Sequence, residues 1–367
     1  MSAPFFSIIV PCYNQGHFLN KAVESVISQG FQDWELWIIN DGSTDQTGQI
    51  AQKLSASDAR IEVITQANLG LSAARNSGIE VATGRILHFL DADDWMLPGC
   101  LEKVVEKFNN PKVDICVSGY SYYLGDQVIH SHRLHSVEIP FERMINANFA
   151  PPVSFFVRKK VLESVGDFDT SLKSCEDWDL WIRAAKSEFR IYSINQVLVA
   201  YRYVAGSMSK KPKQMYDALC EVSSRAAKVD PRISLALPLN KDYDIHLPEK
   251  FKIHFINCLG VSLFQGLIED SKSWFEEESA KFKWSFRMTD WEGLSSNLSF
   301  KHFLTSELIE KVITVNLPSF HQFFISIGYS ENETKKILKR VFATQFKKRN
   351  HLRFGRILGG IINKLIY

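Results

Sequence analysis

The chain has 367 residues, a length for which two domains are expected rather than one. Its 45% apolar and 23% charged residues are typical of a globular protein, and its formal net charge is only +2. So small a charge excludes a protein-wide positive field, which argues against a nucleic-acid partner.

Strands and helices alternate along the first half of the sequence. Short apolar runs rich in β-branched residues predict five strands, at residues 5–10, 34–39, 61–65, 86–90 and 113–118. Apolar residues at helical spacing predict helices at residues 17–29, 71–82 and 97–108, and the turn at residues 41–45 precedes a further one. This alternation predicts an α/β fold with a mostly parallel sheet flanked by helices.

The pattern loosens after Gly125, although residues 153–158 are expected to form a strand and residues 178–186 a helix. Residues 206–213 have the composition of a linker, so we place a domain boundary between residues 210 and 211. Beyond it, helical apolar spacing predicts a mainly helical C-terminal domain over residues 211–367.

The cysteines and the apolar runs predict a cytoplasmic protein. Six scattered cysteines form no CxxC pair, which disfavours a zinc site or a dense disulfide framework and favours reduced thiols. The first residues have neither a basic segment nor a cleavage site, so no signal peptide is expected. No apolar run approaches the ~20 residues needed to span a bilayer.

Polar residues follow three of the predicted strands at the point where each strand ends. These clusters are residues 11–14, 40–41 and 91–94. In open parallel sheets ligands bind beyond the carboxyl ends of the strands. The sequence therefore predicts that the three clusters converge on one crevice.

Asp91 and Asp93 are the candidate metal ligands. They directly follow an apolar strand and point the same way in an extended segment. Carboxylates there are costly to bury unless they are paired or hold a cation, and hard oxygen ligands suit Mg²⁺ or Mn²⁺. The alternative is a turn-and-cap cluster before the helix at residue 97.

Two other kinds of site fit the sequence poorly. An EF-hand fails because Met96 stands where the sharp turn needs glycine. A dinucleotide site fails because no GxGxxG motif follows the first strand.

Five motifs resemble those of the family 2 glycosyltransferases, which are inverting enzymes of the GT-A fold. They are SIIVPCYN, DGSTD, NLGLSAARNSGI, FLDADD and CEDWDLW, which begin at Ser7, Asp41, Asn68, Phe89 and Cys175. Each motif alone is weak, but their order and spacing match the family over residues 5–210. The resemblance implies transfer of a sugar from a nucleoside-diphosphate-sugar, expected to be a UDP-sugar, to a hydroxyl of a glycan or lipid-linked glycan. Such hexosyl or N-acetylhexosaminyl transfer serves cell-surface polysaccharide assembly.

The resemblance also implies how the donor nucleotide is bound. Pro11 and Tyr13 resemble the segment that packs on the base, and Asp41 resembles the carboxylate that contacts the base or ribose. Arg75 lies where the family often approaches the nucleotide. The alternatives are simple packing for Tyr13 and an ion pair within the fold for Arg75.

The metal and catalytic residues are implied in the same way. Asp91 resembles the acid near the donor ribose or sugar, Asp93 the ligand of Mn²⁺ or Mg²⁺, and Asp177 the catalytic base. A sugar hydroxyl is a poor nucleophile near neutral pH, so a carboxylate must take its proton. Glu176 would set the local field or orient the acceptor. The alternative is that Glu176, Asp177 and Asp179 only form a favourable acidic first turn of a helix.

One position departs from the family pattern. Many relatives carry a histidine near the diphosphate just after a Tyr-Arg pair, and here Val204 occupies that position. Valine can neither ligate a metal nor donate to phosphate. Tyr203, Ser207 and Lys210 are the alternative phosphate contacts.

The end of the sequence is basic and amphipathic. No acidic residue follows Glu333, whereas ten lysines and arginines do, and apolar residues from Phe354 to Leu365 recur on one helix face. This pattern predicts a membrane-surface helix within residues 335–367, peripheral to the inner face of the membrane. The alternatives are packing on its own domain or on a second subunit of a homo-oligomer.

Aromatic residues gather in the predicted C-terminal domain. They are Trp274, Phe275, Phe282, Trp284, Phe286 and Trp291. Core packing is the preferred interpretation, and a stacking surface for an acceptor sugar is the alternative.

Two rival classes of protein stay open. A nucleotidyltransferase shares the sheet and metal chemistry but should show a glycine- and lysine-rich phosphate loop after the first strand, where this sequence has none. A catalytically silent nucleotide-sugar-binding protein is supported only by Val204.

Overall fold

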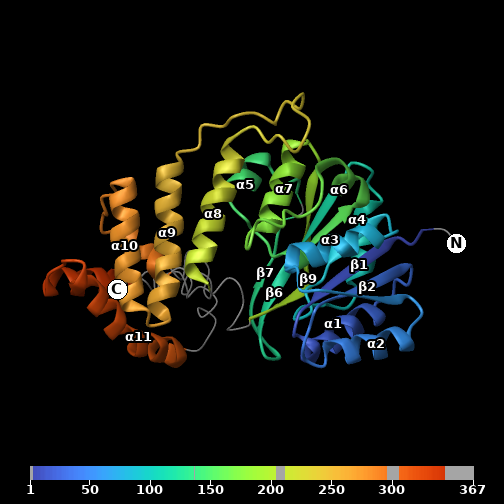
Figure 1. Cartoon of the computed structure of the whole chain (residues 1–367), viewed down its shortest axis with the longest axis horizontal. Helices are drawn as coiled ribbons and strands as arrows, with labels where there is room; N and C mark the ends of the chain where they lie inside the picture. The colour runs from blue at the N-terminus through green and yellow to red at the C-terminus, as the bar shows by residue number, and fades with distance from the viewer. Residues whose placement is uncertain (1–2, 136, 204–210, 296–305, 344–367) are drawn as a thin grey trace. The chain divides into compact units, whose positions relative to one another are not determined.

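The computed structural model describes residues 3–135, 137–203, 211–295 and 306–343 (Figure 1). The chain divides into two compact units. The first runs to residue 204 and includes residues 222–245, and the second contains residues 205–221 and those from 246 onward. The boundary between residues 210 and 211 stays a prediction, but residues 222–245 lie beyond it in sequence while packing with the first unit.

The first unit is built on a sheet with the strand order β3-β2-β1-β4-β8-β6-β9-β5, in which β7 pairs with β6. The strands are β1 (Phe6–Cys12), β2 (Trp34–Asp41), β3 (Ile61–Gln66), β4 (Ile86–Phe89), β5 (Trp95–Met96), β6 (Ile115–Leu124), β7 (Gln127–His132), β8 (Phe155–Arg158) and β9 (Ile191–Arg202). β1 to β4 are mutually parallel where they pair, whereas β8 runs antiparallel to β4 and β6. The predicted α/β fold is confirmed, with a parallel half that carries the strand-end motifs and a mixed half beyond it.

Helices cover this sheet. They are α1 (Gly16–Ile27), α2 (Thr47–Ser57), α3 (Leu71–Val81), α4 (Cys100–Phe108), α5 (Phe141–Asn146), α6 (Lys159–Val165) and α7 (Glu176–Lys186). In α1, for example, Leu19, Ala22, Val23 and Val26 are all fully buried, which is the i, i+3, i+4, i+7 face of a helix. All seven residues of β1 are buried as well, as expected for a central strand covered on both faces.

The second unit is helical. It contains α9 (Leu247–Phe264), α10 (Ile268–Phe282) and α11 (Ser306–Ser326), and α9 and α10 run side by side (Figure 1). α8 (Pro212–Ala227) is shared, since the division between the units falls after Glu221. Trp274 and Trp291 are 6% and 1% exposed and belong to the core of this unit, as the core-packing interpretation requires.

The predicted membrane-surface helix lies almost entirely outside the described residues, which end at residue 343. Within residues 331–343 the chain is helical, and Ile337, Leu338, Val341 and Phe342 are buried. No helix in the described part of the chain is both long and apolar enough to cross a membrane. Membrane binding through residues 335–367 therefore stays a prediction.

Candidate active site

The candidate site lies at the edge where three neighbouring parallel strands end. β1 and β2 pair up to Cys12 opposite Asn40, and β1 and β4 pair up to Ile9 opposite Phe89. The residues that follow each strand therefore emerge at the same edge of the sheet. This strand pairing places the three polar clusters next to one another, which is the basis of the predicted crevice.

The first two clusters are fastened to each other by hydrogen bonds. The side-chain oxygen of Asn14 accepts from the Thr44 backbone N–H at 2.8 Å, and the Asn14 N–H donates to Ser43 Oγ at 3.0 Å. The Ser43 N–H donates in turn to Asn40 Oδ1 at 3.1 Å. Asn14 adopts φ 53°, a left-handed conformation that asparagine tolerates better than most residues. The loops after β1 and β2 thus form a single rigid border of the site.

Asp41 holds the loop that leads into α3. Its buried carboxylate accepts from the backbone N–H groups of Leu69 and Gly70 at 2.9 and 2.8 Å, and from Gln66 Nε2 at 2.8 Å. Gly70, at φ 92°, supplies a backbone turn that a residue with a Cβ rarely adopts. Asp41 therefore sets the start of the helix that carries Arg75.

Arg75 is the centre of the site. Its fully buried guanidinium donates from Nη2 to Asp91 Oδ1 at 2.8 Å and from Nη1 to Glu176 Oε1 at 2.6 Å. It also lies over the ring of Phe168, 5.2 Å from the centroid. Burial alone would lower the pKa of Arg75, but the charges of Asp91 and Glu176 outweigh it and raise that pKa. One cation thus ties the end of β4 to the start of α7.

The acidic turn after β4 is only partly neutralised. The backbone N–H of Asp94 donates to the Asp91 carbonyl at 2.9 Å, which folds the segment so that its carboxylates lie close together. Burial raises the pKa of Asp93 to about 6, and the negative charge of Asp91 adds to this effect. Burial also raises the pKa of Asp94, although Asp94 Oδ1 accepts from the Arg202 backbone N–H at 2.9 Å.

This turn suits a divalent cation. Carboxylate oxygens are the donors that Mg²⁺ and Mn²⁺ prefer, and a cation beside Asp93 would offset both the burial of its carboxylate and the repulsion from Asp91. Within the described residues, no three His, Cys, Asp or Glu side chains come together as a complete metal site. Any metal held by Asp91 and Asp93 would thus need further ligands from substrate or water.

Glu176 and Asp177 begin α7 and face the same region. Both are 5% exposed, and Asp177 Oδ2 accepts from Asn148 Nδ2 at 2.9 Å. Burial raises the pKa of Asp177 to about 7, and the charge of Glu176 contributes to the rise. Cys175, at φ 60°, turns the chain into the helix. The raised pKa and the hydrogen bond from Asn148 make Asp177 the candidate general base of the site.

The predicted site residues are brought together to different degrees. Arg75 contacts Asp91 and Glu176 directly, and Asp41 is linked to them only through the loop before α3. Tyr13 is 47% exposed and, among the described residues, makes no hydrogen bond or ring contact with the others. Pro11 is buried within β1. Val204, Ser207 and Lys210 fall outside the described residues.

Two residues of this region were not predicted. Asn148 follows α5 and gave no signal, because a lone asparagine in an irregular stretch has no recognisable pattern. Arg202 Nε donates to the Asp93 carbonyl at 2.9 Å, and its guanidinium lies between the rings of Phe18 and Trp95, 4.7 Å from each centroid. The position of this basic residue at the end of β9 could have indicated that Arg202 belongs to the site.

Comparisons with known proteins agree with this architecture. Residues 7–166 match the family model described as glycosyl transferase family 2. TuaG of Bacillus subtilis (strain 168), described as a glycosyltransferase of teichuronic acid biosynthesis, is 30% identical over 56% of this chain and 82% of its own length. EpsJ of the same organism, a glycosyltransferase described as uncharacterized, is 29% identical over 57% of this chain, and the match spans 64% of EpsJ.

Solved structures share the fold. TarS 1-349 of S. aureus in complex with UDP-GlcNAc superposes with a TM-score of 0.54, at 18% identity over 96% of this chain and 92% of that one. The mannosyltransferase PcManGT from Pyrobaculum calidifontis, in complex with GDP-Man and Mn²⁺, gives a TM-score of 0.52 at 14% identity over 93% and 88% of the two chains. The fold is therefore that of the GT-A glycosyltransferases. The chain belongs to glycosyl transferase family 2.

Replacement of Arg75 by methionine tests the centre of the site. Arg75→Met leaves the buried Glu176 without its cation, and breaking a buried pair in this way costs about 3–5 kcal/mol of the free energy of unfolding. Urea unfolding measures this loss. The double variant Arg75→Met/Glu176→Gln should recover part of it, because the unpaired charge is gone. Equal stability of the single and double variants would contradict the pairing.

Proposed function

We propose that the protein is an inverting, metal-dependent glycosyltransferase that moves a sugar from a UDP-sugar to a hydroxyl of a glycan or lipid-linked glycan. The observation that carries this proposal is the buried bridge from Asp91 through Arg75 to Glu176. It joins the acidic strand end of a family 2 chain to α7, which carries Asp177 in its first turn.

Asp177 is proposed as the catalytic base. Its carboxylate accepts the proton of the acceptor hydroxyl as the hydroxyl oxygen attacks the anomeric carbon, and the bond to the nucleoside diphosphate breaks on the opposite face. A single displacement of this kind inverts the anomeric configuration. The Asn148 side chain fixes one carboxylate oxygen of Asp177, which supports a defined orientation of the base.

Asp93 and Asp91 are proposed to hold Mn²⁺ or Mg²⁺. When bound, such an ion would neutralise charge that develops on the departing diphosphate. The ion pair with Arg75 holds the Asp91 carboxylate in place, and the Arg202 guanidinium fixes the Asp93 carbonyl, so that the turn is preorganised. Asp93 is the better candidate for a direct ligand because its carboxylate makes no ion pair with Arg75.

The donor nucleotide is proposed to lie along the border formed by the loops after β1 and β2. Tyr13, with 47% of its surface exposed, offers a ring to the base, and Pro11 belongs to the same segment. Asp41 accepts three hydrogen bonds, from Gln66, Leu69 and Gly70, which leaves one lone pair of Oδ2 for a ribose hydroxyl or a base N–H. The UDP-GlcNAc complex of TarS supports UDP, whereas the GDP-Man complex of PcManGT keeps GDP as the alternative.

The acceptor is proposed from the relatives. Teichuronic acid biosynthesis is the role described for TuaG, and Pasteurella multocida chondroitin synthase, 26% identical over half of this chain, is a second relative. Both names support a role in polysaccharide assembly, and we propose hexosyl or N-acetylhexosaminyl transfer as the reaction. A peripheral site at the inner face of the membrane, through residues 335–367, would suit a lipid-linked acceptor.

Replacement of the proposed base separates catalysis from binding. Asp177→Asn should lower the rate of UDP release by about 10²–10⁴-fold, since a general base contributes that much. The rate is measured with the UDP-sugar that the wild-type protein turns over. Affinity for UDP, measured by calorimetry with Mn²⁺, should not change. The exposed Asp126→Asn serves as the control. Transfer that survives Asp177→Asn would remove Asp177 as the base, and wild-type UDP binding without any turnover would favour the silent binding protein.

The pH profile should report the same group. Burial and the charge of Glu176 raise the pKa of Asp177 to about 7, and only the ionised carboxylate can accept a proton. The value of kcat/KM should therefore fall about tenfold per pH unit below neutrality and level off above it. Glu176→Gln removes the like charge and should move the bend to lower pH. A flat profile from about pH 5 to 8 would contradict this assignment.

The metal site is tested through the metal requirement. Addition of EDTA should abolish turnover, and Asp93→Asn should raise the Mn²⁺ concentration for half-maximal turnover by at least about tenfold. Asp126→Asn is again the control, since it removes an exposed carboxylate from the same unit. Wild-type Mn²⁺ dependence in Asp93→Asn would exclude Asp93 as a ligand.

A further inference from the structure

One face of α7 is charged although it is buried. Asp179, Arg183 and Lys186 follow each other at i, i+4 and i+7, and they are 2%, 2% and 0% exposed. Buried charges persist only where they find partners. The partners of this face therefore decide how the helix is held.

The carboxylate of Asp179 receives three guanidinium groups. Arg232 donates to both of its oxygens, at 2.8 and 3.0 Å, and Arg225 donates to Oδ1 at 3.1 Å. Arg183, one turn along α7, donates to Oδ2 at 3.2 Å. Two of the three donors thus come from residues 222–245, which belong to the unit of the sheet.

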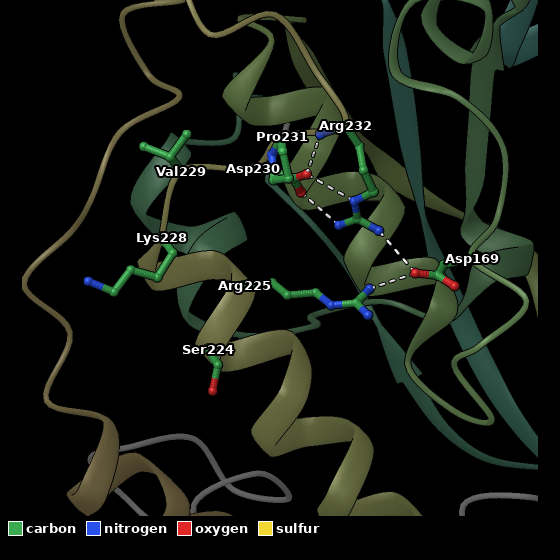
Figure 2. Close-up of a pocket in the computed structure, with 8 residues that line it drawn as sticks. All are labelled: Asp169, Ser224, Arg225, Lys228, Val229, Asp230, Pro231 and Arg232. Atoms are coloured by element: carbon green, nitrogen blue, oxygen red, sulfur yellow. Dashed lines mark hydrogen bonds and ion pairs between the residues drawn. The ribbon is translucent and has the colours of Figure 1, made fainter.

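Arg225 and Arg232 also form ion pairs with two further aspartates. Arg232 makes a bidentate pair with Asp230, at 2.9 and 2.7 Å, and both Arg225 and Arg232 reach Asp169 Oδ2, at 2.8 and 3.2 Å. Figure 2 shows Arg225 and Arg232 converging on Asp169. These three residues line a cavity of about 420 Å³. With Arg183 and Asp179 included, three arginines balance three aspartates, so the network is neutral as a whole.

Lys186 fastens the other end of the same face. Its Nζ donates to the backbone carbonyls of Arg225, at 3.1 Å, and of Lys228. These carbonyls lie at the C-terminal end of α8, where backbone oxygens lack partners within the helix. A buried cation there also suits the negative end of the helix dipole.

We propose that Arg225 and Arg232 are positioning residues for the base Asp177, an inference that rests on the proposed function of Asp177. Asp177 and Asp179 share the first turn of α7, so a constraint on Asp179 fixes where Asp177 lies. A shift of ~1 Å in a reacting group can cost about 10²-fold in rate. The family model ends at residue 166, so these two arginines are supplied from outside the matched region.

The test compares variants of the full chain. Arg232→Met removes the guanidinium that contacts both oxygens of Asp179. Arg225→Met is a milder change because Arg232 remains. Arg232→Lys keeps the positive charge but cannot donate to both oxygens in the bidentate geometry of a guanidinium. Lys228→Met is the matched control: Lys228 forms an exposed pair with Asp242, and its side chain points away from the arginines in Figure 2. Hydrogen exchange of the peptide 176–186 reports on α7 without any substrate.

We expect at least about tenfold faster exchange of peptide 176–186 in Arg232→Met, smaller effects in the two milder variants and none in Lys228→Met. Release of UDP from UDP-GlcNAc, UDP-glucose or UDP-galactose should fall about 10–100-fold in Arg232→Met, while UDP affinity stays at the wild-type value.

Three outcomes would overturn the proposal. The first is a folded Arg232→Met or Arg225→Met with wild-type exchange in peptide 176–186. The second is faster exchange with undiminished turnover. The third is a loss of UDP affinity as large as the loss of turnover, which would mean general damage rather than displacement of the base. Absence of turnover in the wild type with every sugar would instead count against the proposed function, and the exchange result would still decide whether the arginines hold α7.

Discussion

The rest of the site depends on one buried cation. Arg75 satisfies Asp91 at the end of β4 and Glu176 at the start of α7 with the same guanidinium, and both contacts are short. The two acids come from segments 85 residues apart, which no local preference would bring together. Both contacts are charge-assisted, and the side chains of Arg75 and Glu176 are buried, whereas that of Asp91 is 22% exposed. The bridge therefore holds the acidic turn to the helix of Asp177 more firmly than a surface pair would.

A single guanidinium does not neutralise this many carboxylates. Asp91, Asp93, Asp94, Glu176 and Asp177 share the region. Burial raises the pKa values of Asp93, Asp94 and Asp177, and the negative charges of neighbouring carboxylates add to the rise. Two proposed chemical roles are consistent with this concentration of acidic residues. On the side of β4, the negative charge would suit the proposed divalent cation. On the side of α7, burial and the charge of Glu176 raise the pKa of Asp177, which suits its proposed role as the base.

The sequence was sufficient for the parallel half of the fold and insufficient for the supports of the site. Buried strands such as β1 carry continuous apolar runs, and the polar residues after them identify the edge where ligands bind. Asn148, Arg225 and Arg232 could not be recognised, because their roles come from contacts with α7 over 29 to 53 residues of sequence. Asp41 illustrates an intermediate case. Its place at a strand end was predictable, but its use of the carboxylate on the backbone of Leu69 and Gly70 was not.

The contacts of Arg225 and Arg232 with α7 also affect where the boundary of the catalytic domain is drawn. Residues 222–245 pack with the sheet although the segment before them, from residue 205, belongs to the helical unit. A fragment that ends near residue 210 would keep every family motif but would leave Asp179 and Lys186 buried without most of their partners. The catalytic unit is therefore discontinuous in sequence, and its minimal form cannot be obtained by cutting the chain at a single point after the last motif.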